Sequence, residues 1–226
     1  MAAPQIFAQK PQADTPVEVI INRRPLNDFS KNLAEKVSKK EVDLNANFKV
    51  VAEGFLNSDG KLDISIDKKT KQPRSRIITA EGDPKMIQIA VEAIAGISDS
   101  GWLGYLQAIG INKINFTFGQ NDEQLSATLT SEQPTPERAR TLSSNMHSLL
   151  AAVLLMDKIG TKKLGDDEKI LIQAMDATAN EKLFVLNFSL SKSTAQELMK
   201  REIQKELERE NAAKADSSGA SAIKDH

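Results

Sequence analysis

The chain has 226 residues, of which 40% are hydrophobic and 27% are charged, and its formal net charge is −1. This length allows one large domain or two small ones, and the balanced charge argues against a nucleic-acid-binding protein, which needs clustered basic residues to neutralise phosphates. The absence of cysteine excludes disulfides, thiolate metal sites and cysteine nucleophiles. No apolar run approaches the roughly 18 residues of a membrane-spanning helix, so no transmembrane segment is predicted within this sequence.

Both ends of the chain are predicted to lie outside the folded part. Residues 1–16 are rich in proline, glutamine and alanine, a composition that buries too little apolar surface to offset chain entropy. We expect a flexible tether there, preceded by a signal or membrane anchor upstream of residue 1, with an ordinary ragged terminus as the alternative. Residues 211–226 are polar and small, and they are predicted to form a disordered tail.

A repeated pattern of strand, polar turn, strand and helix accounts for most of the apolar residues. A short helix precedes the first repeat, because apolar residues recur every four positions over 29–37. The turns of the three repeats are residues 58–62 (SDGKL), 121–125 (NDEQL) and 180–183 (NEKL).

The first repeat starts near Phe48. Apolar alternation predicts strands over 48–56 and 62–66, then a polar loop over 67–75 and a further short strand at 77–78. Asp83 then begins a helix, because its carboxylate caps free backbone N–H groups and the proline that follows it suits the first helical position.

The second repeat has alternating apolar residues over 114–118 and 125–129, which predict a hairpin, and a helix follows it. In the third repeat, residues 170–174 are interpreted as the first strand, with a helix over 166–175 as the rival interpretation. Residues 183–190 form the clearest strand pattern in the chain, and a last helix follows it.

These patterns predict an α+β fold, in which antiparallel hairpins from repeated strand-turn-strand-helix units form one sheet and helices pack on one of its faces. We expect residues 17–130 to contain the N-terminal helix and the first ββα region, and residues 131–210 to contain a second helix and the third ββα unit. Residues 48–66 and 183–190 are the candidate sheet edges.

Two local features are candidates for partner binding. Trp102 and Tyr105, the only Trp and the only Tyr, lie beside glycines in a predicted short helix and are suited to a recognition patch. A buried Trp102 is the alternative. Lys68, Lys69 and Arg74 belong to a basic loop that is suited to anionic headgroups, with a solvated hairpin extension as the alternative.

The sequence offers little material for catalysis or metal binding. His147 is the only internal histidine, which is too few for a typical zinc site. The segment 57–60 resembles part of a calcium loop, but Ile66 falls where such a loop needs a bidentate glutamate. The adjacent carboxylates of residues 166–168 diverge and suit the beginning of a helix. We therefore expect a non-enzymatic protein with no cofactor and no metal.

The stretch from Phe48 to Asp122 resembles the C-terminal domain of TonB-family energy transducers. The matching segments are residues 58–62 (SDGKL), 81–84 (EGDP), 89–94 (IAVEAI) and 114–118 (INFTF). The resemblance implies a periplasmic protein that is tethered to the inner membrane and binds a partner by adding a strand to its sheet edge.

The expected function is therefore that of a non-catalytic, TonB-like protein of the cell envelope. It would bind protein partners through a sheet edge or a helix face, for energy transduction or coupling, and it would not bind nucleic acid. Two alternatives stay open: an accessory subunit of a membrane-associated complex, and a module that binds a small ligand or a lipid.

Overall fold

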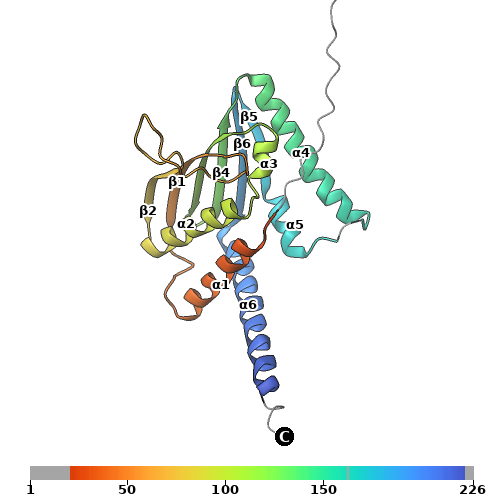
Figure 1. The fold of residues 1–226 in the computed structure, drawn as a ribbon. Coiled ribbons are helices and arrows are strands. Elements are labelled where there is room, and N and C mark those ends of the chain that lie inside the picture. Colours follow the sequence, from red (N-terminus) through yellow and green to blue (C-terminus); the bar gives the residue numbers. More distant parts are fainter. Residues whose placement is uncertain (1–20, 162, 222–226) are drawn as a thin grey trace, which may run out of the picture.

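The computed structural model describes residues 21–161 and 163–221, and of residues 210–221 it describes the backbone only. Figure 1 shows a sheet with helices on one side and a long C-terminal helix that extends away from it. In chain order the elements are α1 (Arg24–Ser38), β1 (Phe48–Phe55), β2 (Arg76–Gly82), α2 (Pro84–Asp99), α3 (Gly104–Ala108), β3 (Lys113–Gln120), β4 (Gln124–Glu132), α4 (Pro136–Lys158), α5 (Asp166–Gln173), β5 (Met175–Asn180), β6 (Leu183–Ser191) and α6 (Lys192–Ser221).

The six strands form one antiparallel sheet in the order β2-β1-β3-β4-β6-β5. Three hairpins are thus joined side by side, and a helix follows each of them, which confirms the predicted α+β class. The β3–β4 turn shows why polar residues end these strands. The Asn121 side chain accepts hydrogen bonds from the backbone N–H groups of Glu123 (2.9 Å) and Gln124 (2.8 Å), which closes the turn.

One face of the sheet is apolar and carries the helices. The register aligns Val50, Phe118, Ala127, Phe188 and Met175 in a single row across five strands. Helix α2 packs against β1 and β2 at one end of this face, and α4 packs against β5 and β6 at the other end (Figure 1). The apolar alternation in the sequence therefore reports the side of the sheet that the helices occupy.

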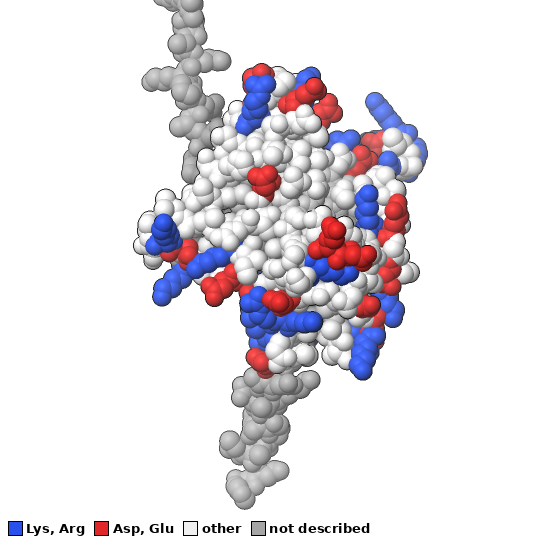
Figure 2. All heavy atoms as spheres, turned by 180° about the vertical axis from the view of Figure 1, so that it is seen from behind, with Lys and Arg blue, Asp and Glu red and all other residues white. Residues whose placement is uncertain are grey.

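The opposite face is polar but carries few charges over its central strands. Thr117, Thr128 and Asn187 lie in one row there, and the Thr128 hydroxyl donates to Asn187 Oδ1 at 3.0 Å. Figure 2 shows this side of the molecule with charged side chains gathered mainly around the margin. None of the described helices packs on this face.

Two core clusters lie on the helix side of the sheet. The first lies beneath α3 and α4 and contains Leu106, Leu142 and Phe184, which are fully buried. The second joins α1 and α2 to the sheet, and Val50 and Ala90 at its centre have no exposed surface. Together the clusters bury the apolar faces of both ends of the sheet and so hold the fold together.

The structure corrects the prediction for the first hairpin. Residues 62–66 are not a strand, and Ile64 is 79% exposed; the partner of β1 is β2, a full strand where only 77–78 was expected. The reason lies in the loop between them. Asp63 accepts the Ser65 N–H at 2.9 Å, and Ser98 Oγ accepts the Leu62 N–H at 3.0 Å, so side chains capture donors that a strand ladder over 62–66 needs.

The predicted strand over 170–174 is wrong, and the rival helical interpretation is correct, because residues 166–173 form α5. Glu168 accepts the Gly165 N–H at 2.9 Å, and acidic residues fill the first turn, where they complement the helix dipole. The predicted sheet edges 48–66 and 183–190 are also wrong. Strands β1 and β6 each pair on both sides, which leaves β2 and β5 as the edges of the sheet.

The ends of the chain and the expected regions can be placed only in part. The expected tether over 1–16 and residues 222–226 lie outside the described residues. Helix α6 continues to Ser221, past residue 210, after which a disordered tail was expected. Strands from 17–130 and from 131–210 share one sheet. No helix within 21–161 and 163–221 combines the length and apolarity needed to cross a membrane.

Candidate functional site: an apolar groove on the helix side of the sheet

An apolar groove lies between α2 and the β6–β5 end of the sheet, where neither α2 nor α4 covers the central strands. Its volume is about 250 Å³, and its lining is entirely apolar. The groove is open to solvent rather than enclosed. Concave apolar sites of this kind are where soluble proteins most often bind small molecules.

The floor of the groove comes from neighbouring strands. Phe116 and Phe118 project from β3, Ala127 from β4 and Phe188 from β6, all on the helix-covered face. Ala127 lies between Phe118 and Phe188 in the register, and its small side chain leaves the hollow between the two rings. The floor therefore presents aromatic rings on either side of a gap.

The walls come from α2, from the turn before α3 and from the start of β5. Ala93, Ile94 and Ile97 line the groove from one face of α2, Trp102 lines it from the turn before α3, and Met175 lines it at the start of β5. Asp83 positions α2, because its side chain accepts the backbone N–H groups of Lys85 (3.0 Å) and Met86 (2.9 Å). The α2 wall is thus anchored at its N-terminus.

The two aromatic residues predicted to form a recognition patch, Trp102 and Tyr105, lie in different surroundings. Trp102 is 36% exposed and contributes to the groove, so it is neither a buried plug nor a free surface residue. Tyr105 is 48% exposed and does not line the groove. Because Trp102 is the only tryptophan of the chain, it is also an intrinsic fluorescent reporter of what enters the groove.

The predicted basic loop lies apart from the groove lining. Arg74 pairs with Asp63 at 2.8 Å, and its guanidinium lies 4.8 Å from the centre of the Phe55 ring. Lys68 and Lys69 are exposed in the same loop. The backbone N–H groups of Thr70 and Lys69 hold the pKa of Asp67 below its usual range, which identifies Asp67 as the carboxylate that orders this loop.

The titratable groups outside the loop form structural pairs. His147 lies 3.0 Å from Asp176, and both side chains are more than half exposed. Asp167 at the beginning of α5 pairs with Arg201 (2.8 Å) and Lys205 (3.2 Å) of α6. Within the described part of the chain, no three His, Asp or Glu side chains converge as a metal site would require.

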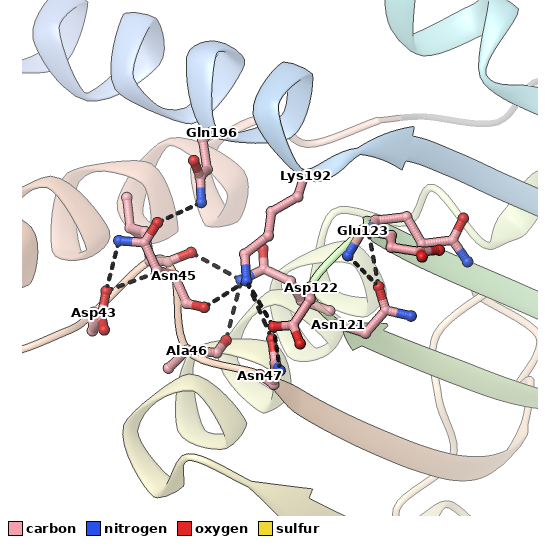
Figure 3. Close-up of polar contacts among 12 residues, drawn as sticks. Asp43, Asn45, Ala46, Asn47, Asn121, Asp122, Glu123, Lys192 and Gln196 are labelled. Atoms are coloured by element: carbon pink, nitrogen blue, oxygen red, sulfur yellow. Dashed lines mark hydrogen bonds and ion pairs between the residues drawn. The ribbon is translucent and has the colours of Figure 1, made fainter.

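A polar cluster around Lys192 was not predicted from the sequence (Figure 3). The Lys192 ammonium donates to the Asn45 backbone carbonyl (2.8 Å) and to Asn47 Oδ1 (3.2 Å), and it lies 3.8 Å from Asp122. Gln196 donates to Asn45 Oδ1 at 2.7 Å. These bonds fasten the beginning of α6 to the loop before β1 and to the β3–β4 turn, so we assign the cluster a structural role.

Sequence reasoning missed most of the groove because its lining looks like ordinary core. Phe116, Phe118 and Phe188 follow the same alternation as fully buried residues. The one available signal is the alanine at position 127 between strands that carry phenylalanine at the corresponding place. Comparison of the chain with protein-family models, with curated proteins and with solved structures found no match.

Proposed function

We propose that the protein is a non-catalytic binding module whose groove takes a small apolar ligand, of which the acyl chain of a lipid is the best-fitting class. The observation that carries the proposal is an open hollow of about 250 Å³ whose exposed lining surface is apolar. Such a lining leaves a polar ligand group unpaired, which costs free energy, and rewards a ligand that is apolar along its buried length. A headgroup would stay at the solvent-exposed mouth.

The size of the groove favours a chain over a bulkier partner. A volume of about 250 Å³ holds about eight groups the size of a water molecule, each of which takes about 30 Å³. A helix with its side chains is about 10 Å wide, so a groove of this volume receives at most part of one of its faces. Aromatic rings beside a narrow gap suit a flexible methylene chain.

The test is a series of saturated alcohols and fatty acids of increasing length, titrated by calorimetry and by Trp102 fluorescence. Each buried methylene contributes about 0.8 kcal/mol, so affinity should rise about fourfold per carbon and level off near eight buried carbons. A series without a plateau, or with no binding at any length, contradicts the proposal.

Two alanines of α2 supply a matched pair of variants. Ala93→Phe fills the groove from its wall, whereas Ala95→Phe makes the same change at an exposed position that does not line it. We expect Ala93→Phe to abolish chain binding and Ala95→Phe to preserve it. Equal binding by both variants would place the ligand elsewhere.

A second candidate function is the TonB-like one, recognition of an extended segment of a periplasmic protein at a sheet edge. The observation that favours it is β2, an edge strand whose Ile77 (39%) and Ile78 (48%) are exposed. Protease accessibility in spheroplasts of the natural host tests the proposed periplasmic location and tether. If an Ile77→Lys/Ile78→Lys variant still binds its periplasmic partner, β2 is not the strand that the partner recognises.

A further inference from the structure

The C-terminal half of α4 exposes apolar side chains that nothing in the described structure covers. The buried residues of α4, namely Ala139, Leu142 and Ser143, all lie in its N-terminal half. In the half that follows, Leu149 (54%), Leu155 (56%), Met156 (45%) and the adjoining Ile159 (66%) are exposed. None of these four residues lines the groove.

This half of α4 is apolar around most of its circumference. Within the run 149–156 every residue is apolar, and none of the eight is buried. A helix that is apolar all round is stable in water only when something covers it. The helix therefore needs an occupant on its outer side as well as the partial cover that it has on its inner side.

The charges beside this surface favour an anionic occupant. Lys158 and Lys163 are exposed on either side of Ile159, and neither makes an ion pair within the described residues. Two of the neighbouring acidic groups are paired: Asp157 with Lys169 at 2.9 Å, and Asp167 with Arg201 of α6 at 2.8 Å. Asp166 and Glu168 are exposed at the beginning of α5, where Glu168 accepts the Gly165 N–H.

We propose that the C-terminal half of α4 docks on the surface of an anionic lipid bilayer, with Leu155, Met156 and Ile159 entering the headgroup region and Lys158 and Lys163 facing the lipid phosphates. An apolar helical surface flanked by lysines is the arrangement that binds at a membrane interface without crossing it. The lysines supply the preference for anionic lipid. The inference is independent of the groove, because the two surfaces share no residue.

The experiment is sedimentation of the full chain with vesicles of phosphatidylcholine containing one quarter phosphatidylglycerol, and with vesicles of phosphatidylcholine alone. We expect binding to the anionic vesicles that weakens as salt is raised, and much weaker binding to the neutral ones. Equal binding to both vesicles, or no binding to either, overturns the proposal.

Matched variants test the surface itself. Leu155→Glu/Ile159→Glu should lower vesicle binding at least tenfold, whereas Ile64→Glu/Ile66→Glu changes two exposed isoleucines of the distant loop and should leave it unchanged. Circular dichroism confirms that each variant is folded. If the control pair loses binding as well, α4 is not the docking surface.

A charge-reversal pair tests the role of the lysines. Lys158→Glu/Lys163→Glu should weaken binding by more than about fivefold for each lysine, while Lys68→Glu/Lys69→Glu should have little effect. The opposite result would assign the membrane contact to the basic loop. Sedimentation velocity tests whether a second copy of the chain covers this surface instead. If the wild-type chain is a dimer and Leu155→Glu/Ile159→Glu dissociates it, the bilayer proposal is overturned.

Discussion

Phe184 and Phe188 lie four residues apart on β6 and point to the same face of the sheet, yet their surroundings differ. Phe184 is fully buried in the cluster beneath α3 and α4, whereas Phe188 lines the open groove between α2 and the end of the sheet. Two phenylalanines on the same strand thus have different roles: one packs in the core, and the other lines an open groove. The helix layer decides which role each has, because the cluster beneath α3 and α4 encloses Phe184, whereas Phe188 lies farther along the same strand at the open groove.

The strongest test of this contrast is truncation of the two phenylalanines. Phe184→Ala removes a ring from the closed core and should lower the free energy of unfolding by about 3–5 kcal/mol, because it loses transfer free energy and leaves a cavity. Phe188→Ala enlarges a hollow that solvent already reaches, so its cost should be clearly smaller. Urea denaturation measures both.

The outcome also decides whether the groove is open in solution. Equal losses of stability for Phe184→Ala and Phe188→Ala would mean that α2 or α4 closes over Phe188 when the protein is free. In that case the chain-length series should show weak binding at every length.

The next largest effect concerns two glycines that both have positive φ. Gly60 has φ +69°, and an added Cβ would lie 2.2 Å from the Gly104 Cα, whereas Gly160 has φ +76° with open space around it. Gly160→Ala should cost the left-handed backbone term of about 1–2 kcal/mol. Gly60→Ala adds overpacking of about 1–3 kcal/mol, because the loop presses against the beginning of α3 beside the closed core.

Thermal and urea unfolding of the two alanine variants separates these terms. Gly160 serves as the control for backbone strain, since it lies in the turn after α4, where an added Cβ meets no neighbouring atom. Equal losses of the free energy of unfolding for the two variants would show that the loop over 56–75 does not pack tightly against α3.

The sequence was sufficient to predict the architecture where local signals and tertiary structure agree. The second hairpin and the helix that begins at Pro136 follow from apolar alternation, from the Asn121 turn and from the Thr135 cap, which accepts the Arg138 N–H at 3.2 Å. The strand predicted at 62–66 is wrong because the side chains of Asp63 and Ser98 accept backbone N–H groups there. Alternating isoleucines carry the same pattern whether or not they pair with a strand.

The candidate groove was beyond the reach of the sequence for a different reason. The sequence offers Trp102 as a candidate for a recognition patch, with burial as the alternative, but neither its neighbours nor the hollow follow from the pattern. The groove depends on how far apart α2 and α4 lie on the sheet, which is a property of the register and of helix packing. Met175 joins Phe188 in the lining because β5 pairs with β6 and the register sets these two residues side by side.

The N-terminal caps of α2 and α4, the helices at the two ends of the sheet, supply a test with a smaller expected effect. Asp83 accepts two backbone N–H groups at the beginning of α2, and Thr135 accepts one at the beginning of α4. Asp83→Ala should cost about 1 kcal/mol and Thr135→Ala somewhat less. Because α2 is the wall of the groove, Asp83→Ala should also weaken acyl-chain binding, whereas Thr135→Ala should not. Equal losses of binding would mean that α4 contributes to the site.

The smallest effect concerns Asp157, whose carboxylate connects the C-terminal half of α4 to the beginning of α5. The Leu164 backbone N–H (2.8 Å) and the Lys169 ammonium (2.9 Å) hold the pKa of Asp157 below its usual value of 3.8. A carboxyl group whose pKa is lower in the folded chain contributes stability that is complete above the unfolded value and is lost as pH falls through the folded value. The stability gap between wild type and Asp157→Asn should therefore be constant at neutral pH and shrink below about pH 4.

Urea unfolding between pH 3 and pH 7 measures this gap, with Asp166→Asn as a control that removes the same charge from an exposed neighbour. A gap for Asp157→Asn that stays constant down to pH 3 would mean that its carboxylate does not hold the α4–α5 connection. The connection matters because these contacts, unlike the apolar packing beneath the first half of α4, leave the apolar surface of the second half available to a membrane. A pH-sensitive contribution from Asp157 would thus show that a carboxylate holds the C-terminal half of α4 in place, whereas apolar packing holds its N-terminal half.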